Sequence, residues 1–236
     1  MDFKFKYLLS SYLLFCLILF GNYWIWRALS YSLPIFILLV ACSLLGYRII
    51  KGKGRLLAFL LLLMFLVFSQ WSSTSPTSLT VFSNDDIRLK DQRLKEYPPV
   101  YIKIGPGAIW IPVAHWFEER KEAVAASRVA TNFSEVLDPN LYFFANHPRE
   151  RVGVSEFGKF PYVFFPFFVV GILEAVGLRK TKGFFLSLIL AILLLSLIGN
   201  KNELGPFVLF PYIVSITVFG AELLTQKTKS LFSRPK

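Results

Sequence analysis

The chain has 236 residues, of which 55% are hydrophobic, 17% aromatic and only 17% charged, and its mean hydropathy is +0.54. This composition excludes an ordinary soluble domain and is typical of a membrane protein. The formal net charge of +11 raises the question of nucleic acid. From Ser73 to Lys159, however, eleven basic residues balance eleven acidic ones, so the excess lies in the hydrophobic flanking segments. We therefore reject nucleic acid as a partner and expect the excess charge to anchor loops against the lipid bilayer.

Six apolar windows are candidates for membrane helices, because a hydrocarbon core about 30 Å thick needs roughly 20 apolar residues of α-helix. In chain order they are Tyr7–Trp26, Ala28–Tyr47, Leu56–Trp71, Phe160–Leu178, Gly183–Asn200 and Leu204–Leu224. Only Arg27 separates the first two windows, so we expect them to form a tight helical hairpin. The third window can extend by one turn before Pro76 ends it.

The distribution of Lys and Arg predicts the orientation of these helices, because short loops rich in these residues stay in the cytoplasm. Thirteen basic residues lie on one side of the predicted spans, within residues 4–6, 48–55, 179–182 and 227–236. The opposite short loops hold only Arg27 and Lys201. We therefore predict a multi-pass protein of the plasma membrane with both termini in the cytoplasm.

The predicted fold is a membrane all-α bundle of six transmembrane helices with a small α+β extracytoplasmic domain between the third and fourth helices. Residues 1–72 form three transmembrane helices, residues 73–159 form the extracytoplasmic domain, and residues 160–236 form three transmembrane helices and a basic cytoplasmic tail. This division places the electroneutral part of the chain outside the cell.

Local signals within residues 73–159 predict three elements. A polar cap at Ser83 or Asn84, followed by acidic residues and a later Pro-Pro pair, indicates a short surface helix. The stretch VYIKIGPGAIWIPV alternates around Gly-Pro-Gly, which favours a β-hairpin. Helical spacing returns from His115 and is broken at Asp138-Pro139.

Two acidic residues fall within predicted spans, where a charge facing lipid is costly. Glu174 lies close in sequence to the basic residues at positions 179–182, and Glu222 lies close to Lys227. We expect each acid to form an ion pair with these neighbours at the cytoplasmic boundary. No chain of intramembrane acids indicates an ion or proton path.

Asp85 and Asp86 are the candidate catalytic residues. Adjacent carboxylates close to a membrane face can act as a general base or bind a divalent cation at a lipid phosphate. The alternative is that both acids stabilise the start of a helix. The only histidines, His115 and His147, show no HExxH-like spacing, so no metal site and no cofactor are predicted.

The candidate substrate-binding residues are Arg149, Arg151, His147 and Trp116. The motif HPRER places both arginines close to the predicted bilayer surface, where guanidinium groups can bind a phosphate or pyrophosphate headgroup with two hydrogen bonds each. The neighbouring His115-Trp116 pair is expected at the membrane interface. The alternative is that the arginines form ordinary surface ion pairs with nearby acids.

The segment NFSEVLDPNLYFFANHPRERVGVSEFGKFPYVFFPFFVVGI, from Asn132, resembles part of the polytopic glycosyltransferases of the GT-C type, the bacterial relatives of protein mannosyltransferases. The resemblance covers about 40 of the 236 residues. It implies transfer of a sugar from a polyprenyl-phosphate donor on the extracytoplasmic face. The family carries an acidic catalytic residue in its first outer loop, whereas the loop here, RALS, has no carboxylate, and the family has more spans than six.

Two hypotheses follow. In the first, the protein is an enzyme, or a reduced relative of one, in envelope glycan assembly. Asp85 or Asp86 then acts as base, and Arg149 and Arg151 hold a polyprenyl-phosphate-linked sugar. In the second, it is a non-catalytic membrane subunit or scaffold whose outer domain docks a protein partner.

Overall fold

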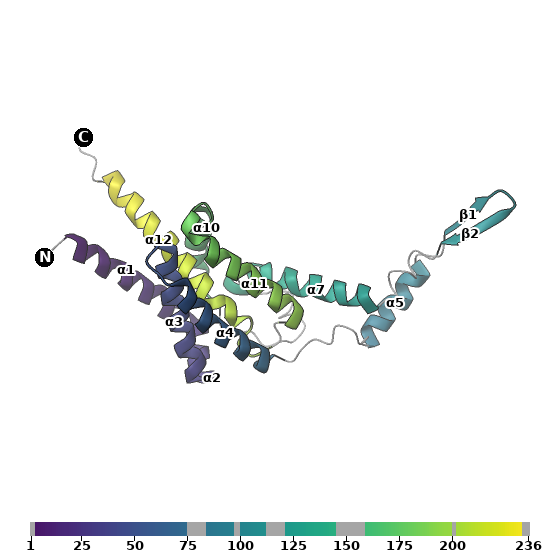
Figure 1. The fold of residues 1–236 in the computed structure, drawn as a ribbon, viewed down its shortest axis with the longest axis horizontal. Coiled ribbons are helices and arrows are strands. Elements are labelled where there is room, and N and C mark those ends of the chain that lie inside the picture. The colour runs from purple at the N-terminus through teal and green to yellow at the C-terminus, as the bar shows by residue number, and fades with distance from the viewer. Residues whose placement is uncertain are drawn as a thin grey trace.

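The computed structural model describes residues 3–74, 84–96, 100–111, 121–144, 159–199 and 202–232. Most of these residues are helical, and the helices gather in one bundle from which a thinner arm projects (Figure 1). The long helices of the bundle are α1 (Phe3–Phe20), α2 (Tyr23–Tyr31), α3 (Leu33–Ile50), α4 (Leu56–Ser73), α10 (Phe165–Val176), α11 (Lys182–Ile198) and α12 (Phe210–Phe232).

Helix α12 is the centre of the bundle. It contacts α1, α3 and α10, and 89% of the most apolar 18-residue window within Phe207–Thr228 is buried inside the protein. Its close contact with α10 depends on two glycines. A Cβ added at Gly220 would lie 1.9 Å from the carbonyl oxygen of Phe167, and one at Gly171 would lie 2.1 Å from that of Ile216. The two helices therefore meet backbone to backbone.

Four stretches among the described residues are long and apolar enough to cross a membrane: α3, α4, Arg179–Ile198 and Phe207–Thr228. A fifth exists if α1 and α2, which are bent by 64° at their junction, count as one span. These helices have the length and composition of those in a membrane protein. The six predicted spans are not confirmed, because the remaining window forms only the shorter helical stretch Tyr162–Val176.

The stretch Tyr162–Val176 is shorter than the predicted window partly because its helical structure begins only at Tyr162. Phe160 and Pro161 precede the helix, and the Phe160 N–H donates a hydrogen bond to the Tyr142 carbonyl oxygen at 2.9 Å. Helical structure then begins with the 3-10 turn η1 (Tyr162–Phe164) and continues as α10. The apolar residues before Tyr162 are therefore used in tertiary contacts and do not lengthen the span.

The predicted hairpin turn at Arg27 is wrong, because Arg27 lies inside α2. The chain bends earlier, at Asn22. The Asn22 side-chain amide donates to the carbonyl oxygens of Ile18 and Leu19 at 2.9 and 2.6 Å, and its Oδ1 accepts the Ile25 N–H at 3.0 Å. One buried side chain thus provides hydrogen bonds to the carbonyl oxygens at the end of α1 and caps the start of α2. The second turn follows α2 at Ser32.

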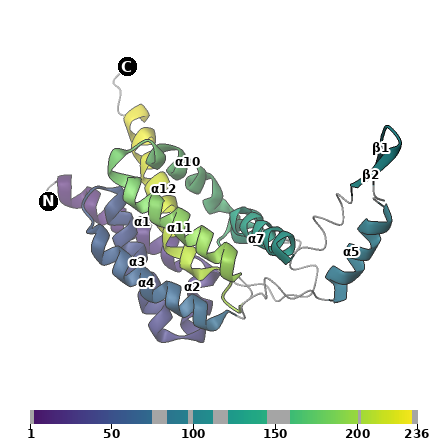
Figure 2. The same cartoon turned by 45° about the vertical axis from the view of Figure 1, so that its right-hand side comes forward.

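The arm consists of α5 (Asn84–Glu96) and the hairpin of β1 (Val100–Ile104) and β2 (Gly107–Ile111). The strands are antiparallel and place Tyr101 opposite Trp110, and Gly105 supplies the positive φ of +61° that the turn requires. The surface helix and the hairpin are therefore both present as predicted. A compact α+β domain is not confirmed, since α5 and the hairpin follow each other along an arm that stands away from the bundle (Figure 2).

Helix α7 (Lys121–Leu137) leads back to the bundle, where its second half packs against α11. The Asn132 side-chain amide is buried and donates to the Ser196 carbonyl oxygen at 3.1 Å. The short helix α8 (Asn140–Phe143) follows, with Leu141 and Phe143 in the hydrophobic core. The last described part of residues 73–144 thus packs on the apolar helices.

Candidate functional site

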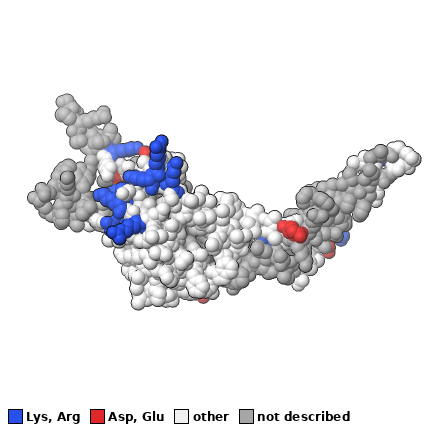
Figure 3. Space-filling view, viewed as in Figure 1, with Lys and Arg blue, Asp and Glu red and all other residues white. Residues whose placement is uncertain are grey.

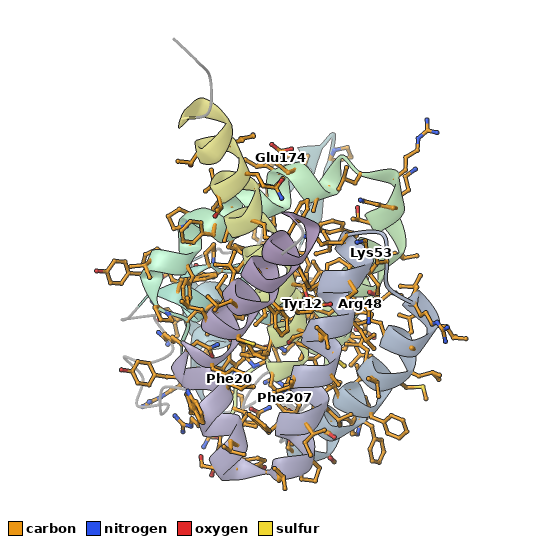
Figure 4. All side chains as sticks on the ribbon, turned by 90° about the vertical axis from the view of Figure 1, so that its left-hand side faces the viewer. Tyr12, Phe20, Arg48, Lys53, Glu174 and Phe207 are labelled. Carbon is orange, nitrogen blue, oxygen red and sulfur yellow. The ribbon has the colours of Figure 1, made fainter. Side chains whose placement is uncertain are left out.

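The two ends of the bundle differ in charge. The α3–α4 loop and the α10–α11 loop lie side by side, because a Cβ added at Gly52 would be 3.0 Å from Cδ of Lys180. Lys and Arg side chains gather at this end, which we call the basic end (Figure 3). Figure 4 shows Lys53 and Glu174 toward the basic end and Phe207 toward the other, which we call the distal end. Both predicted basic loops therefore lie at one end of the bundle.

The candidate catalytic residues lie in the arm. Asp85 and Asp86 lie in the first turn of α5, which begins at Asn84. Trp116, His147, Arg149 and Arg151 lie outside the described residues. Their geometry relative to one another and to the two acids stays a prediction.

The two chain ends that flank residues 145–158 meet at the distal end of the bundle. Besides the backbone hydrogen bond between Phe160 and Tyr142, the Lys159 ammonium donates to the Phe144 carbonyl oxygen at 2.5 Å. Phe144 also contacts the ring of Phe165, with 5.2 Å between ring centroids. The residues that flank positions 145–158, where three of the four candidate substrate-binding residues fall, therefore lie together at one place, which we call the loop base.

Aromatic packing fixes the loop base to the bundle. The Trp24 ring of α2 meets Phe160 edge-on at 5.8 Å and Phe210 edge-on at 5.3 Å between ring centroids. Phe143 contacts Phe160 from the other side at 5.7 Å. The buried Trp24 indole also donates to the Leu204 carbonyl oxygen at 2.8 Å, so its one polar group is satisfied. These contacts join α2, α8, the chain at Phe160 and α12 in one aromatic cluster.

Tyr142 adds a buried hydrogen bond beneath this cluster. Its hydroxyl donates to the Val136 carbonyl oxygen at 2.6 Å. Burial raises the pKa of Tyr142 above its usual value, and the Asp138 carboxylate raises it further. The hydroxyl therefore stays protonated at neutral pH and serves as a structural donor.

A second polar group at the distal end is the buried Gln70 side chain of α4. Its Nε2 donates to the Gly205 carbonyl oxygen at 3.1 Å and to the Thr74 hydroxyl at 3.2 Å, and its Oε1 accepts the Val208 N–H at 3.4 Å. Asn202 donates to the same Thr74 hydroxyl at 3.0 Å. A neutral amide thus provides hydrogen-bond partners for the carbonyl oxygen and the N–H in the irregular backbone that precedes α12.

At the basic end the buried polar group is charged. Glu222, only 5% exposed, accepts a hydrogen bond of 2.5 Å from the Tyr47 hydroxyl and forms an ion pair of 2.7 Å with Lys51. The Lys51 ammonium also lies 5.4 Å from the centre of the Tyr47 ring. This group joins the end of α3 to the middle of α12.

The predicted partners of the two acids are therefore wrong, although both acids form ion pairs. Glu222 pairs with Lys51, which is distant in sequence, and Lys227 pairs with Glu174 at 3.1 Å in an exposed bridge between α12 and α10. Residues five apart on a helix, such as Glu222 and Lys227, do not share a face. Glu174 reaches across to α12 because the two helices pack so closely.

Within the described residues, no group of three or more His, Cys, Asp or Glu side chains could hold a metal ion. Comparison of the chain with protein-family models, with curated proteins and with solved structures finds no match.

Proposed function

We propose that the chain is a multi-pass plasma-membrane protein of envelope glycan assembly that binds a polyprenyl-phosphate-linked sugar at the distal end of the bundle. The loop base carries this proposal. A chain advances at most about 3.6 Å per residue, and Arg149 is only five residues after Phe144 in the sequence. This short separation supports a phosphate site near the end of the apolar helices.

The charge distribution supports the side of the membrane. If basic loops stay in the cytoplasm, the distal end faces outward, and both termini are cytoplasmic. The resemblance to GT-C glycosyltransferases implies a lipid-linked donor on that same face, which supports this orientation of the site. There, Arg149 and Arg151 would bind the phosphate, with His147 and Trp116 at the interface, while the isoprenoid chain stays in the bilayer.

If the protein is catalytic, Asp85 or Asp86 is the proposed general base. The carboxylate would take the proton of an acceptor hydroxyl, whose oxygen attacks the anomeric carbon as the polyprenyl phosphate leaves with the bonding electron pair. Sugar transfer should then disappear in Asp85→Asn or Asp86→Asn. Unchanged transfer in both variants would remove the two acids from the proposal.

Binding is tested with purified protein and a short-chain polyprenyl phosphate, with complex formation followed by native mass spectrometry. We expect the double variant Arg149→Gln/Arg151→Gln to bind about tenfold or more weakly, because each lost charge-assisted hydrogen bond costs about 1.5–3 kcal/mol. Arg179→Gln/Lys180→Gln is the matched control, since it removes two charges from the basic end. Equal binding by wild type and by the Arg149/Arg151 variant would contradict the proposal.

The second candidate is the non-catalytic subunit, which the arm favours. Val100, Tyr101 and Ile102 of β1 are exposed by 55%, 71% and 44%, an apolar strand surface that stands clear of the bundle. A photoreactive amino acid at position 101 should then crosslink to a partner protein in intact cells. The crosslink should be lost in Ile102→Asp and kept in Gln92→Asp, an exposed change on α5.

A further inference from the structure

An apolar groove of about 530 Å³ lies between α1, the segment of η1 and α10, and α12. Leu14 and Leu17 of α1 form one wall, and Phe167 of α10 lies on the other. This volume falls within the range of about 300–1,000 Å³ that is usual for small-molecule sites. Phe164 of η1 also lines the groove, four residues after Phe160 of the loop base, so the groove runs from near the loop base along α12 to Thr228.

The floor of the groove is a stripe on α12 that includes Ala221, Leu224, Thr225 and Thr228. The hydroxyl of Thr225 donates to the Ala221 carbonyl oxygen, and that of Thr228 donates to the Leu224 carbonyl oxygen, both at 2.8 Å. The hydroxyl protons are thus committed to the helix itself. A ligand meets mainly methyl groups and aliphatic carbon, which favours a hydrocarbon chain.

The groove ends toward the basic end of the bundle, because Thr228, which lines it, is next to Lys227 of the Glu174–Lys227 bridge. Helices α1 and α12 diverge toward their free ends (Figure 1). The bridge between Glu174 and Lys227 joins the wall and the floor there, since Glu174 lies two turns beyond Phe167 on α10. The same end of the bundle holds further basic residues in and beside the α3–α4 and α10–α11 loops: Arg48, Lys53, Arg55, Arg179, Lys180 and Lys182 (Figure 3).

Acidic groups do not cancel this charge among the described residues of the basic end. Glu222 is held by Lys51 and Glu174 by Lys227, so each acid is already neutralised by a lysine. An anion at the rim would therefore face an excess of Lys and Arg. The groove thus combines a hydrocarbon floor with a cationic rim, which is the complement of an anionic lipid.

We propose that the groove holds an acyl chain of an anionic glycerophospholipid from the adjoining leaflet, with the phosphate headgroup at the basic rim. The bilayer supplies this ligand directly, because the groove opens on the surface of helices that are long and apolar enough to span it. The proposed headgroup position lies at the opposite end of the bundle from the headgroup of the proposed polyprenyl phosphate. Competition between the two lipids distinguishes the two proposals.

The test uses the full-length protein in phosphatidylcholine vesicles that contain a minority of phosphatidylglycerol with a photoreactive acyl chain. We expect labelling to concentrate in residues 14–18 and 221–228. Thr225→Trp should lower this labelling about tenfold, because the indole occupies the groove. Gln226→Trp is the matched control: it introduces the same side chain one residue along at an exposed position, and labelling should not change.

Thr228→Trp, which fills the groove nearer its rim, provides a second variant if Thr225→Trp does not fold. Equal labelling of the groove in wild type and in either folded variant would overturn the site. Labelling spread evenly over lipid-facing residues such as Leu57 and Met64 would do the same. Equal labelling by phosphatidylcholine with the same probe would contradict the preference for an anionic headgroup. Competition by polyprenyl phosphate but not by phosphatidylglycerol would contradict the proposal that the ligand is a glycerophospholipid.

Discussion

The two ends of the bundle satisfy their buried polar groups in different ways. At the distal end the neutral side chains of Gln70 and Trp24 bind backbone carbonyl oxygens in the irregular segment before α12. At the basic end the buried group is the carboxylate of Glu222, held by Lys51 and Tyr47. The difference shows that a buried charge is placed where the loops supply a countercharge, whereas neutral groups serve where they do not.

The largest expected loss of stability comes from changing the close contact between α10 and α12. Gly220→Leu should lower the free energy of unfolding by about 3 kcal/mol or more, because a side chain there would overlap the Phe167 carbonyl oxygen and separate α10 from α12. Gly177→Ala is the control, since the nearest atom to an added Cβ is 3.8 Å away. Thermal unfolding in detergent measures both, and equal stability of the two variants would refute the backbone contact.

The next prediction separates buried from exposed ion pairs at the basic end. Lys51→Met should cost about 3 kcal/mol, because it leaves the Glu222 carboxylate buried without its countercharge. Lys227→Met should cost less than about 1 kcal/mol, since the Glu174–Lys227 bridge is exposed. The double variant Lys51→Met/Glu222→Leu should recover most of the loss. If both single variants lose the same stability, the distinction between the pairs fails.

Gln70→Leu tests the distal end. It should cost about 2 kcal/mol, because the Val208 N–H and the Gly205 carbonyl oxygen lose their partner while the site stays buried. Gln226→Leu makes the same change at an exposed position of α12 and should have little effect. A neutral result for Gln70→Leu would show that the hydrogen bonds of this amide do not stabilise the distal end.

The smallest effect is expected for Trp24→Phe. The substitution should cost about 1 kcal/mol through loss of the buried hydrogen bond to the Leu204 carbonyl oxygen. Trp26→Phe provides a matched control, since the Trp26 indole makes a hydrogen bond of the same 2.8 Å length to Phe20 at an exposed position. Equal losses in both variants would show that burial does not strengthen the bond at Trp24.

The sequence predicted the features that depend on local pattern. The apolar windows located the long helices, and the basic loops predicted which turns share one end of the bundle. The Gly21-Asn22 pair, a common turn dipeptide within an apolar window, was the available signal for the bend that was missed. Gln70, a polar side chain in another apolar window, likewise indicated a buried hydrogen-bonding position.

The remaining features depend on tertiary packing. The Glu222–Lys51 pair joins residues 171 positions apart, so neighbours in the sequence could not reveal it. The groove arises only where α1, α10 and α12 meet. Of the candidate site residues, Asp85 and Asp86 are placed on α5, and the role of all six stays a prediction.

The central claim is that the basic end faces the cytoplasm while the arm lies across the membrane from it. After replacement of Cys16 and Cys42 by alanine, single cysteines are introduced by Lys53→Cys in the α3–α4 loop and by Gln92→Cys in α5, both at exposed positions. With a membrane-impermeant maleimide, the Lys53→Cys protein should react only in inside-out vesicles and the Gln92→Cys protein only in intact cells. Reaction of both from the same side would contradict the account.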